Sequence, residues 1–233
     1  MYSRLFPHNH SRLIHLYAWG LFFFLLGILA MPRQSDAQYF MFGKNRVQYQ
    51  QFDWRYIQTE HFDIYYYGEK NYYLTDFTAT SLEAAYKQLS NDFRHEIADR
   101  ISVIIYDSHN DFSQTNVVAL PTNSEGIAGV TDLYKNRMTI PFMGDYASFR
   151  HTLHHELVHA VMNDMFYGGS VQSMVQNNVQ LRIPMWFSEG IAEYTSLGWD
   201  TNTDMYIRDA VNNNYLPDIS RLSGYFAYRG GQA

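Results

Sequence analysis

The chain has 233 residues and no cysteine, which excludes disulfides, thiolate metal ligands and cysteine nucleophiles. Its formal net charge is −6, and without residues 1–37 the chain keeps 14 basic and 22 acidic side chains. An acidic surface repels the phosphates of nucleic acids, so we expect no nucleic-acid partner. The length suits one domain with a substantial core.

The first 37 residues have the pattern of a targeting segment. Two arginines precede an uncharged stretch at residues 16–30, and residues 35–37 form a small-x-small cleavage site. We therefore predict a signal peptide at residues 1–37 and an exported protein, which is periplasmic, outer-membrane-associated or secreted. An uncleaved anchor helix is the alternative, because the apolar stretch from about Leu13 to Met31 could nearly span a bilayer.

The rest of the chain has weak periodicity at residues 38–58, which we expect to be irregular, and clearer patterns after that. In chain order, these patterns predict a strand at 61–67, a helix at 75–98, a strand at 101–106, a short helix within 107–115, strands at 126–130 and 137–140, and helices at 146–165, 185–197 (or from 188) and 203–213. The order of elements predicts an α+β class, in which a small mixed sheet packs on the 146–165 helix and a mainly helical C-terminal lobe follows.

Proline and glycine add three local predictions. Pro141 ends the strand at 137–140 and suggests the edge of a sheet, because proline cannot donate a hydrogen bond to a neighbouring strand. The glycine pairs that begin at Gly168 and Gly230 are predicted to form turns.

The segment from His151 to His159 contains His155, Glu156 and His159 in the order His-Glu-x-x-His. On a helix, residues four apart lie on one face, so two imidazoles can bind one zinc ion while the glutamate reaches its water. The alternative is a buried helix with incidental histidines. That alternative is weaker, because several imidazoles near an apolar face cost free energy unless something binds them.

A catalytic zinc site has three protein ligands, so a third must be found. Asp164 is a poor candidate, because it lies five residues after His159 and points roughly 140° away from it around the helix. Glu189 and Glu193 lie on the next predicted helix among largely apolar residues. We predict Glu189 as the metal ligand and Glu193 as the acceptor of a hydrogen bond from the ring of a ligating histidine. The reverse assignment stays open.

Two sequence blocks resemble a known family. HELVH followed by PMWFSEGIAEY is similar to the gluzincins, specifically the peptidase MA-like group, which pairs HExxH with a W-x-x-E-G-x-A-x-Y helix. Weaker likeness extends over roughly residues 54–228. The resemblance implies a zincin-like fold, with His155, His159 and Glu189 as ligands of Zn2+ and Glu156 as the general base. It also implies that an edge strand, here residues 137–140, pairs with an extended peptide.

In bacterial relatives the catalytic domain follows a signal peptide and can precede a β-propeller of the Tol-associated type. Such domains also continue into another helix, so we expect residues 38–233 to be one metallopeptidase domain that is truncated at its C-terminal end. The resemblance implies envelope association as well. An oxyanion donor is still needed, and His151, His154, Tyr194 and Tyr228 stay open as candidates.

These observations predict an exported zinc metallopeptidase that acts on a peptide or protein substrate through a metal-activated water and Glu156. The alternative is a catalytically silent scaffold module of an envelope complex, although a decayed site would be expected to lose Glu156 or a ligand first. A weaker third reading is hydrolysis of a non-peptide amide such as a cell-wall cross-link.

Overall fold

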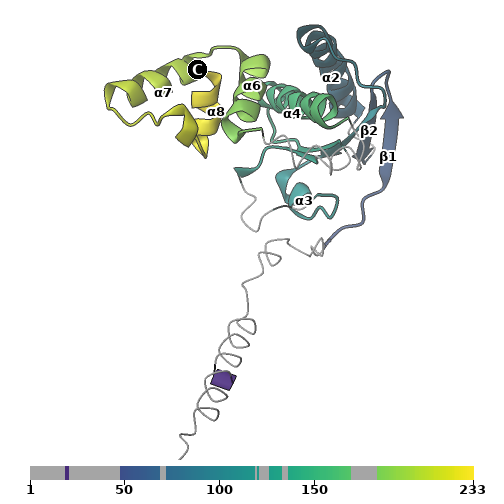
Figure 1. Cartoon of the computed structure of the whole chain (residues 1–233). Helices are drawn as coiled ribbons and strands as arrows, with labels where there is room; N and C mark the ends of the chain where they lie inside the picture. Colours follow the sequence, from purple (N-terminus) through teal and green to yellow (C-terminus); the bar gives the residue numbers. More distant parts are fainter. Residues whose placement is uncertain are drawn as a thin grey trace, which may run out of the picture. The chain divides into compact units, whose positions relative to one another are not determined.

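The computed structural model describes residues 19–20, 48–68, 72–118, 120, 126–132, 136–168 and 183–233. The chain divides into two compact units, residues 1–42 and 43–233, and the labelled helices and strands of Figure 1 belong to the second. Apart from positions 19 and 20, the predicted signal peptide lies outside the described residues. Within the described part of the chain, no helix has both the length and the apolar character needed to cross a membrane.

A five-stranded mixed sheet forms the centre of the second unit. The strands are β1 (Trp54–Gln58), β2 (Phe62–Tyr67), β3 (Ile101–Tyr106), β4 (Val130–Asp132) and β5 (Arg137–Pro141), in the spatial order β1-β2-β3-β5-β4. The three inner strands β2, β3 and β5 run parallel to one another. Both edge strands are antiparallel to their neighbours, β1 to β2 and β4 to β5.

The sheet has a core on each face. Helices α2 (Tyr72–Phe93) and α4 (Tyr146–Tyr167) cover one face, and the short helix α3 (His109–Ser113) lies on the other (Figure 1). Strand β3 alternates between the two cores, with Val103 and Ile105 in the larger one and Ile104 and Tyr106 in the smaller one. This double burial explains why its sequence is almost continuously apolar.

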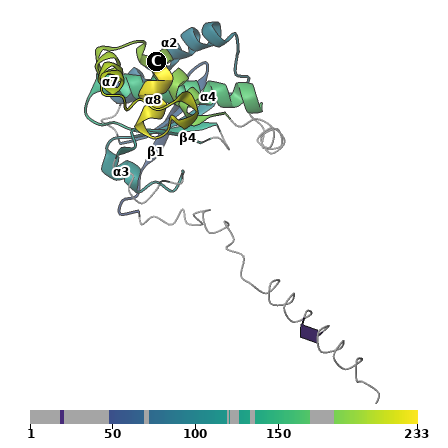
Figure 2. The same ribbon diagram turned by 60° about the vertical axis from the view of Figure 1, so that its left-hand side comes forward.

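The C-terminal lobe is helical. It contains α6 (Met185–Leu197), α7 (Thr201–Asn212), the 3-10 turn η4 (Ile219–Arg221) and α8 (Tyr225–Gln232), and α7 and α8 come to the front in Figure 2. Helix α8 packs directly on α6. The two backbones are so close that a Cβ atom added to Gly190 would overlap the backbone of Gly231. A Cβ atom on Gly231 would in turn overlap the carbonyl oxygen of Trp186. Glycine at both positions therefore allows the two backbones to touch.

The structure is α+β, with the small mixed sheet beneath α4 and the helical lobe after it. Four local predictions were wrong. The strand predicted at residues 126–130 forms instead at Val130–Asp132. Strand β1 forms inside the segment predicted to be irregular, because it is a largely exposed edge strand and needs no apolar alternation. Strand β5 is internal, and Pro141 is tolerated there because it is the last residue of the strand. Residues 137–140 are therefore not the edge strand expected to pair with a peptide, because β3 and β4 occupy both sides of β5. Residues 230–231 lie within α8 and form no turn.

Candidate metal and active site

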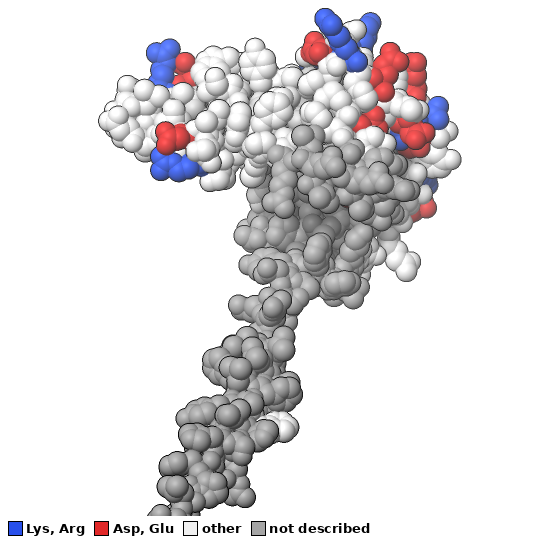
Figure 3. Space-filling model, viewed as in Figure 1, with Lys and Arg blue, Asp and Glu red and all other residues white. Residues whose placement is uncertain are grey.

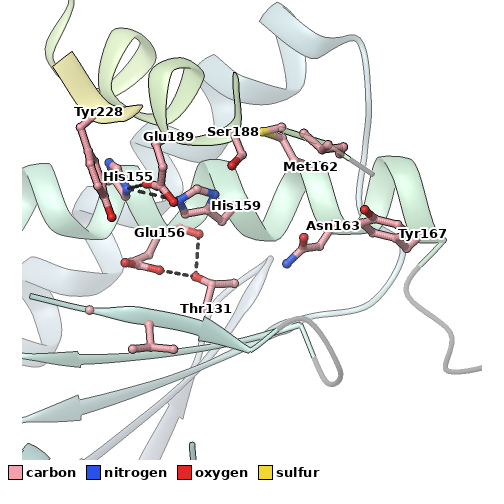
Figure 4. A pocket seen from close by; sticks show the side chains of 13 residues that line it. Thr131, His155, Glu156, His159, Met162, Asn163, Tyr167, Ser188, Glu189 and Tyr228 are labelled. Carbon is pink, nitrogen blue, oxygen red and sulfur yellow. Dashed lines mark hydrogen bonds and ion pairs between the residues drawn. The ribbon is translucent and has the colours of Figure 1, made fainter. Parts of the chain in front are cut away.

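Helix α4 carries the two histidines of the motif. It begins after Asp145, whose side chain accepts a hydrogen bond of 2.6 Å from the amide of Ser148, and it ends at Gly168 in the left-handed conformation (φ 66°). Its apolar side chains lie in the larger core and fix the rotation of the helix about its axis. His155 and His159 consequently project together toward α6, as Figure 4 shows.

The side chain of Glu189, on α6, meets both imidazoles. Its Oε2 atom lies 3.2 Å from His155 Nε2 and 3.4 Å from His159 Nε2, and the two Nε2 atoms are 3.2 Å apart. The three side chains are largely shielded from solvent, with 11%, 19% and 14% of the side-chain area exposed for His155, His159 and Glu189. Two nitrogen donors and one oxygen donor thus converge closely enough to hold one metal ion.

Glu193 lies one helical turn further on and contacts the other side of the His155 ring. Its Oε1 atom is 3.0 Å from His155 Nδ1 and 3.5 Å from His151 Nε2, and its Oε2 atom is 3.5 Å from Arg229 Nη1. His151, His155 and Glu193 are themselves close enough to hold a metal. The fixed positive charge of Arg229 disfavours a cation there, so the geometry favours Glu189 as the ligand and Glu193 as the partner of His155.

Contacts between the charged side chains shift the pKa values of His155, Glu189 and Glu193. Burial by itself would lower the pKa of His155, but contacts with Glu189 and Glu193 outweigh burial and raise that pKa to about 9. Burial would raise the pKa of Glu189, yet hydrogen bonds with His155 and His159 lower it to about 2. The pKa of Glu193 is lowered in the same way, against its burial, by His151 and His155. All three side chains therefore favour their charged forms.

The local charges fit a divalent cation. Three carboxylates, those of Glu156, Glu189 and Glu193, have little solvent exposure, and among the described residues Arg229 is the fixed cation in contact with them. Buried carboxylates are stable when they are paired with positive charge or bind a metal. A set of two imidazoles and one carboxylate can bind zinc and other divalent transition metals. The residues present therefore suit a divalent metal ion, zinc included.

The carboxylate of Glu156 is held against the edge of the sheet. The Thr131 hydroxyl group of β4 donates a hydrogen bond of 2.6 Å to Glu156 Oε2 and lies 3.0 Å from the Glu156 carbonyl oxygen (Figure 4). A Cβ atom at Gly129 would lie 2.9 Å from Glu156 Cγ, closer than real contacts allow. Glu156 also lines a cavity of about 380 Å³ together with His155, His159 and Glu189. Thr131 and Gly129 could not be predicted as site residues from the sequence, because neither belongs to the motif.

The four candidate oxyanion donors lie in different places. Tyr228, on α8, lines the cavity with its ring nearly parallel to that of His155, at 20° and 6.1 Å between centroids. Burial and the nearby carboxylates raise its pKa to about 12. His151 faces Glu193, whereas Tyr194 is exposed and His154 lines neither cavity that borders Glu156. Of the four, Tyr228 lines both cavities that border Glu156, and His151 lines the second.

The rejected candidate Asp164 lies outside the group. Its Oδ2 atom is 2.8 Å from Nε2 of His95, and the two side chains form their own ion pair. Arg229 is a further contributor that the sequence did not indicate, because it follows Tyr228 on a helix that had not been predicted.

Comparison of the chain with protein-family models, with curated proteins and with solved structures returned no match. The similarity to gluzincins therefore rests on the two sequence blocks that contain His155, Glu156, His159 and Glu189.

Proposed function

We propose that this protein is an exported, zinc-dependent peptide hydrolase with a zincin-like fold of the gluzincin type. The observation that carries the proposal is the position of Glu156, whose carboxylate lines the same cavity as the converging donor atoms of His155, His159 and Glu189. A general base beside a three-ligand metal site is the arrangement that metal-assisted hydrolysis of an amide requires. Export is inferred from the targeting pattern at residues 1–37.

In this proposal His155, His159 and Glu189 hold the zinc ion. When bound in such a site, zinc lowers the pKa of a water molecule to about 7 and polarises a carbonyl oxygen. The Oε1 atom of Glu193 lies 3.0 Å from Nδ1 of His155 and favours the tautomer with its proton on Nδ1, which leaves Nε2 free as a ligand. Arg229 balances the charge of Glu193 and links α8 to the site.

Glu156 acts as the general base. It takes a proton from the attacking water and passes it to the leaving amine nitrogen, so its carboxylate must be held still and within reach of both. The hydrogen bond from Thr131 engages Oε2 and leaves Oε1 next to Gly129. Strand β4 thus supports the base directly.

Tyr228 supplies the hydrogen-bond donor. A pKa of about 12 keeps its hydroxyl group protonated at neutral pH, and a fixed donor in a site sheltered from water stabilises a developing oxyanion. Tyr228 is preferred among the four candidate donors because it lies in the wall of the cavity that Glu156 also lines.

The test is substitution of Glu156 by glutamine, which removes the base and preserves its size. We expect the Glu156→Gln protein to bind zinc as the parent does, while hydrolysis of a generic peptide library falls by several orders of magnitude. Glu96→Gln is the matched control, because Glu96 is exposed, lies in the loop after α2 and lines neither cavity that borders Glu156. Unchanged turnover in Glu156→Gln, or an equal loss in the control, would contradict the proposal.

A further inference from the structure

Two cavities border Glu156, one on each side of it along α4. The first, of about 380 Å³, extends past Met162 and Asn163 to Tyr167, near the C-terminal end of the helix. The second, of about 410 Å³, extends past Thr152 and His151 toward its N-terminal end. Both are lined by Gly129, His155, Glu156 and Tyr228, so the two cavities meet at the proposed catalytic residues.

One stretch of backbone forms a wall of both cavities. Residues 126–129 line the second cavity and residues 129–131 line the first, and the stretch ends in the edge strand β4. An extended peptide rises about 3.3 Å per residue, so a wall from residue 127 to residue 131 can lie beside about five residues of a substrate. The proposed general base faces the middle of this wall, beside Gly129.

Among the described residues, most side chains that line the outer parts of the two cavities are uncharged. In the first cavity the described flanking residues include Met162, Asn163 and Tyr167, and in the second they include Ile127 and Tyr225. Glu193 and His151 also border the second cavity, but the Glu193 carboxylate is paired with Arg229, whose Nη1 atom lies 3.5 Å from Oε2. On the face drawn in Figure 3, charged side chains gather over α2 and α7, and uncharged residues lie between them.

From this geometry we propose that the substrate is an internal, unfolded segment of a polypeptide, which lies across both cavities, so that the enzyme is an endopeptidase. This inference rests on the proposed function and specifies its substrate. Uncharged flanks suit backbone and uncharged side chains, whereas a free chain end requires a group of opposite charge. One amide C–N bond breaks, and water supplies a hydroxyl group to the carbonyl carbon and a proton to the nitrogen. Both products remain peptides.

The first test compares substrates with and without free ends. The zinc-loaded protein is incubated with ten-residue peptides that are acetylated and amidated, and with aminoacyl nitroanilides and free dipeptides. We expect cleavage of the blocked peptides at internal bonds, read by mass spectrometry. Release of single terminal residues alone, with the blocked peptides intact, would overturn the inference and leave the proposed function standing. No hydrolysis of any substrate would overturn both.

The second test obstructs each cavity separately. Ala128 lines the second cavity and Asn163 the first, and Ala128→Trp and Asn163→Trp would each fill one side. An endopeptidase uses both sides, so each variant should cleave the blocked peptides more slowly by roughly tenfold or more. Ala147→Trp, an exposed position that lines neither cavity, is the control. A loss in one variant alone would contradict the inference, and circular dichroism shows that each variant is folded.

Discussion

The two halves of the candidate site are held in place in different ways. His155 and His159 belong to α4, whose buried side chains Leu157, Val158 and Val161 lie in the main core with no exposed surface. Glu189 belongs to α6, in which the buried residues are Gly190, Ala192 and Glu193. One half of the site is therefore fixed by a hydrophobic core. The other half places only Ala192 fully in that core and relies on a close contact between the backbones of α6 and α8.

This difference has a consequence for stability. Several large apolar side chains of the C-terminal lobe are exposed, among them Met185 (48%), Tyr194 (59%) and Trp199 (50%). Burial of apolar surface is the main source of stability, at roughly 25 cal/mol per Å². We therefore expect the lobe that contains α6 and α8 to unfold locally more readily than the sheet and α4.

The largest expected loss of stability comes from the core of α4. Leu157→Ala removes a side chain with no exposed surface and leaves a cavity in the main core. The free energy of unfolding should fall by about 2–5 kcal/mol, measured by urea denaturation. Leu197→Ala on α6 is the comparison, because Leu197 is 38% exposed and should lose much less. Equal losses would show that the two halves do not differ.

The next prediction concerns the contact between α6 and α8. Gly190→Ala places a methyl group against the backbone of Gly231, so the free energy of unfolding should fall by about 1–3 kcal/mol. Zinc affinity should fall as well, because Glu189 is the neighbouring residue. Gly126→Ala is the control, since a Cβ atom there meets nothing within 4 Å. If Gly190→Ala unfolds and binds zinc as the parent does, the close packing of the two helices is wrong.

A smaller effect is expected when Glu193 is changed without altering its size. Glu193→Gln removes the charge that faces His155 Nδ1, and outer partners of this kind typically contribute about 10- to 100-fold to metal affinity. Competition with a chelator measures the zinc affinity directly. Glu83→Gln is the control, since Glu83 pairs with His61. An unchanged zinc affinity would indicate that Glu193 has no role in orienting His155.

The last prediction is a dependence of stability on pH in protein stripped of metal. The raised pKa of His155 contributes stability that is complete below 6.5 and is lost as the pH rises through about 9. The lowered pKa of Glu189 contributes stability that is complete above 4.5 and is lost as the pH falls toward about 2. The metal-free protein should therefore be most stable between pH 4.5 and pH 6.5, where both contributions are complete.

Urea midpoints at about pH 5.5 and about pH 9 measure this dependence. His155→Asn should reduce the difference between the two midpoints, because the shifted histidine is gone. A midpoint that rises toward alkaline pH in the parent protein would contradict the account of the charges.

The elements that are buried in the main core are also the ones that the sequence predicts well. Strand β3, helix α4 and helix α6 were predicted closely, because their apolar periodicity reflects burial that each element needs on its own. His155, Glu156, His159 and Glu189 were named from helical spacing and from the cost of buried charge. In the structure these four residues come together around one cavity.

The contacts made by other parts of the chain could not be predicted in this way. Thr131 contacts Glu156 across 25 positions in the chain, and Arg229 contacts Glu193 from a helix with two glycines. Glycine in a helix interior normally signals a break, so residues 230–231 were read as a turn. Their role depends on the position of α6, which local sequence does not encode.

Metal content is the most direct measurement of the central claim, that two imidazoles of α4 and one carboxylate of α6 bind a single zinc ion. Folded protein, dialysed against trace zinc and analysed by mass spectrometry of the elements, should contain one zinc ion per chain. The zinc should be lost in a protein with His155→Asn and His159→Asn and retained in one with His61→Asn. Zinc far below one per chain in folded parent protein, or equal zinc in all three proteins, would contradict the account.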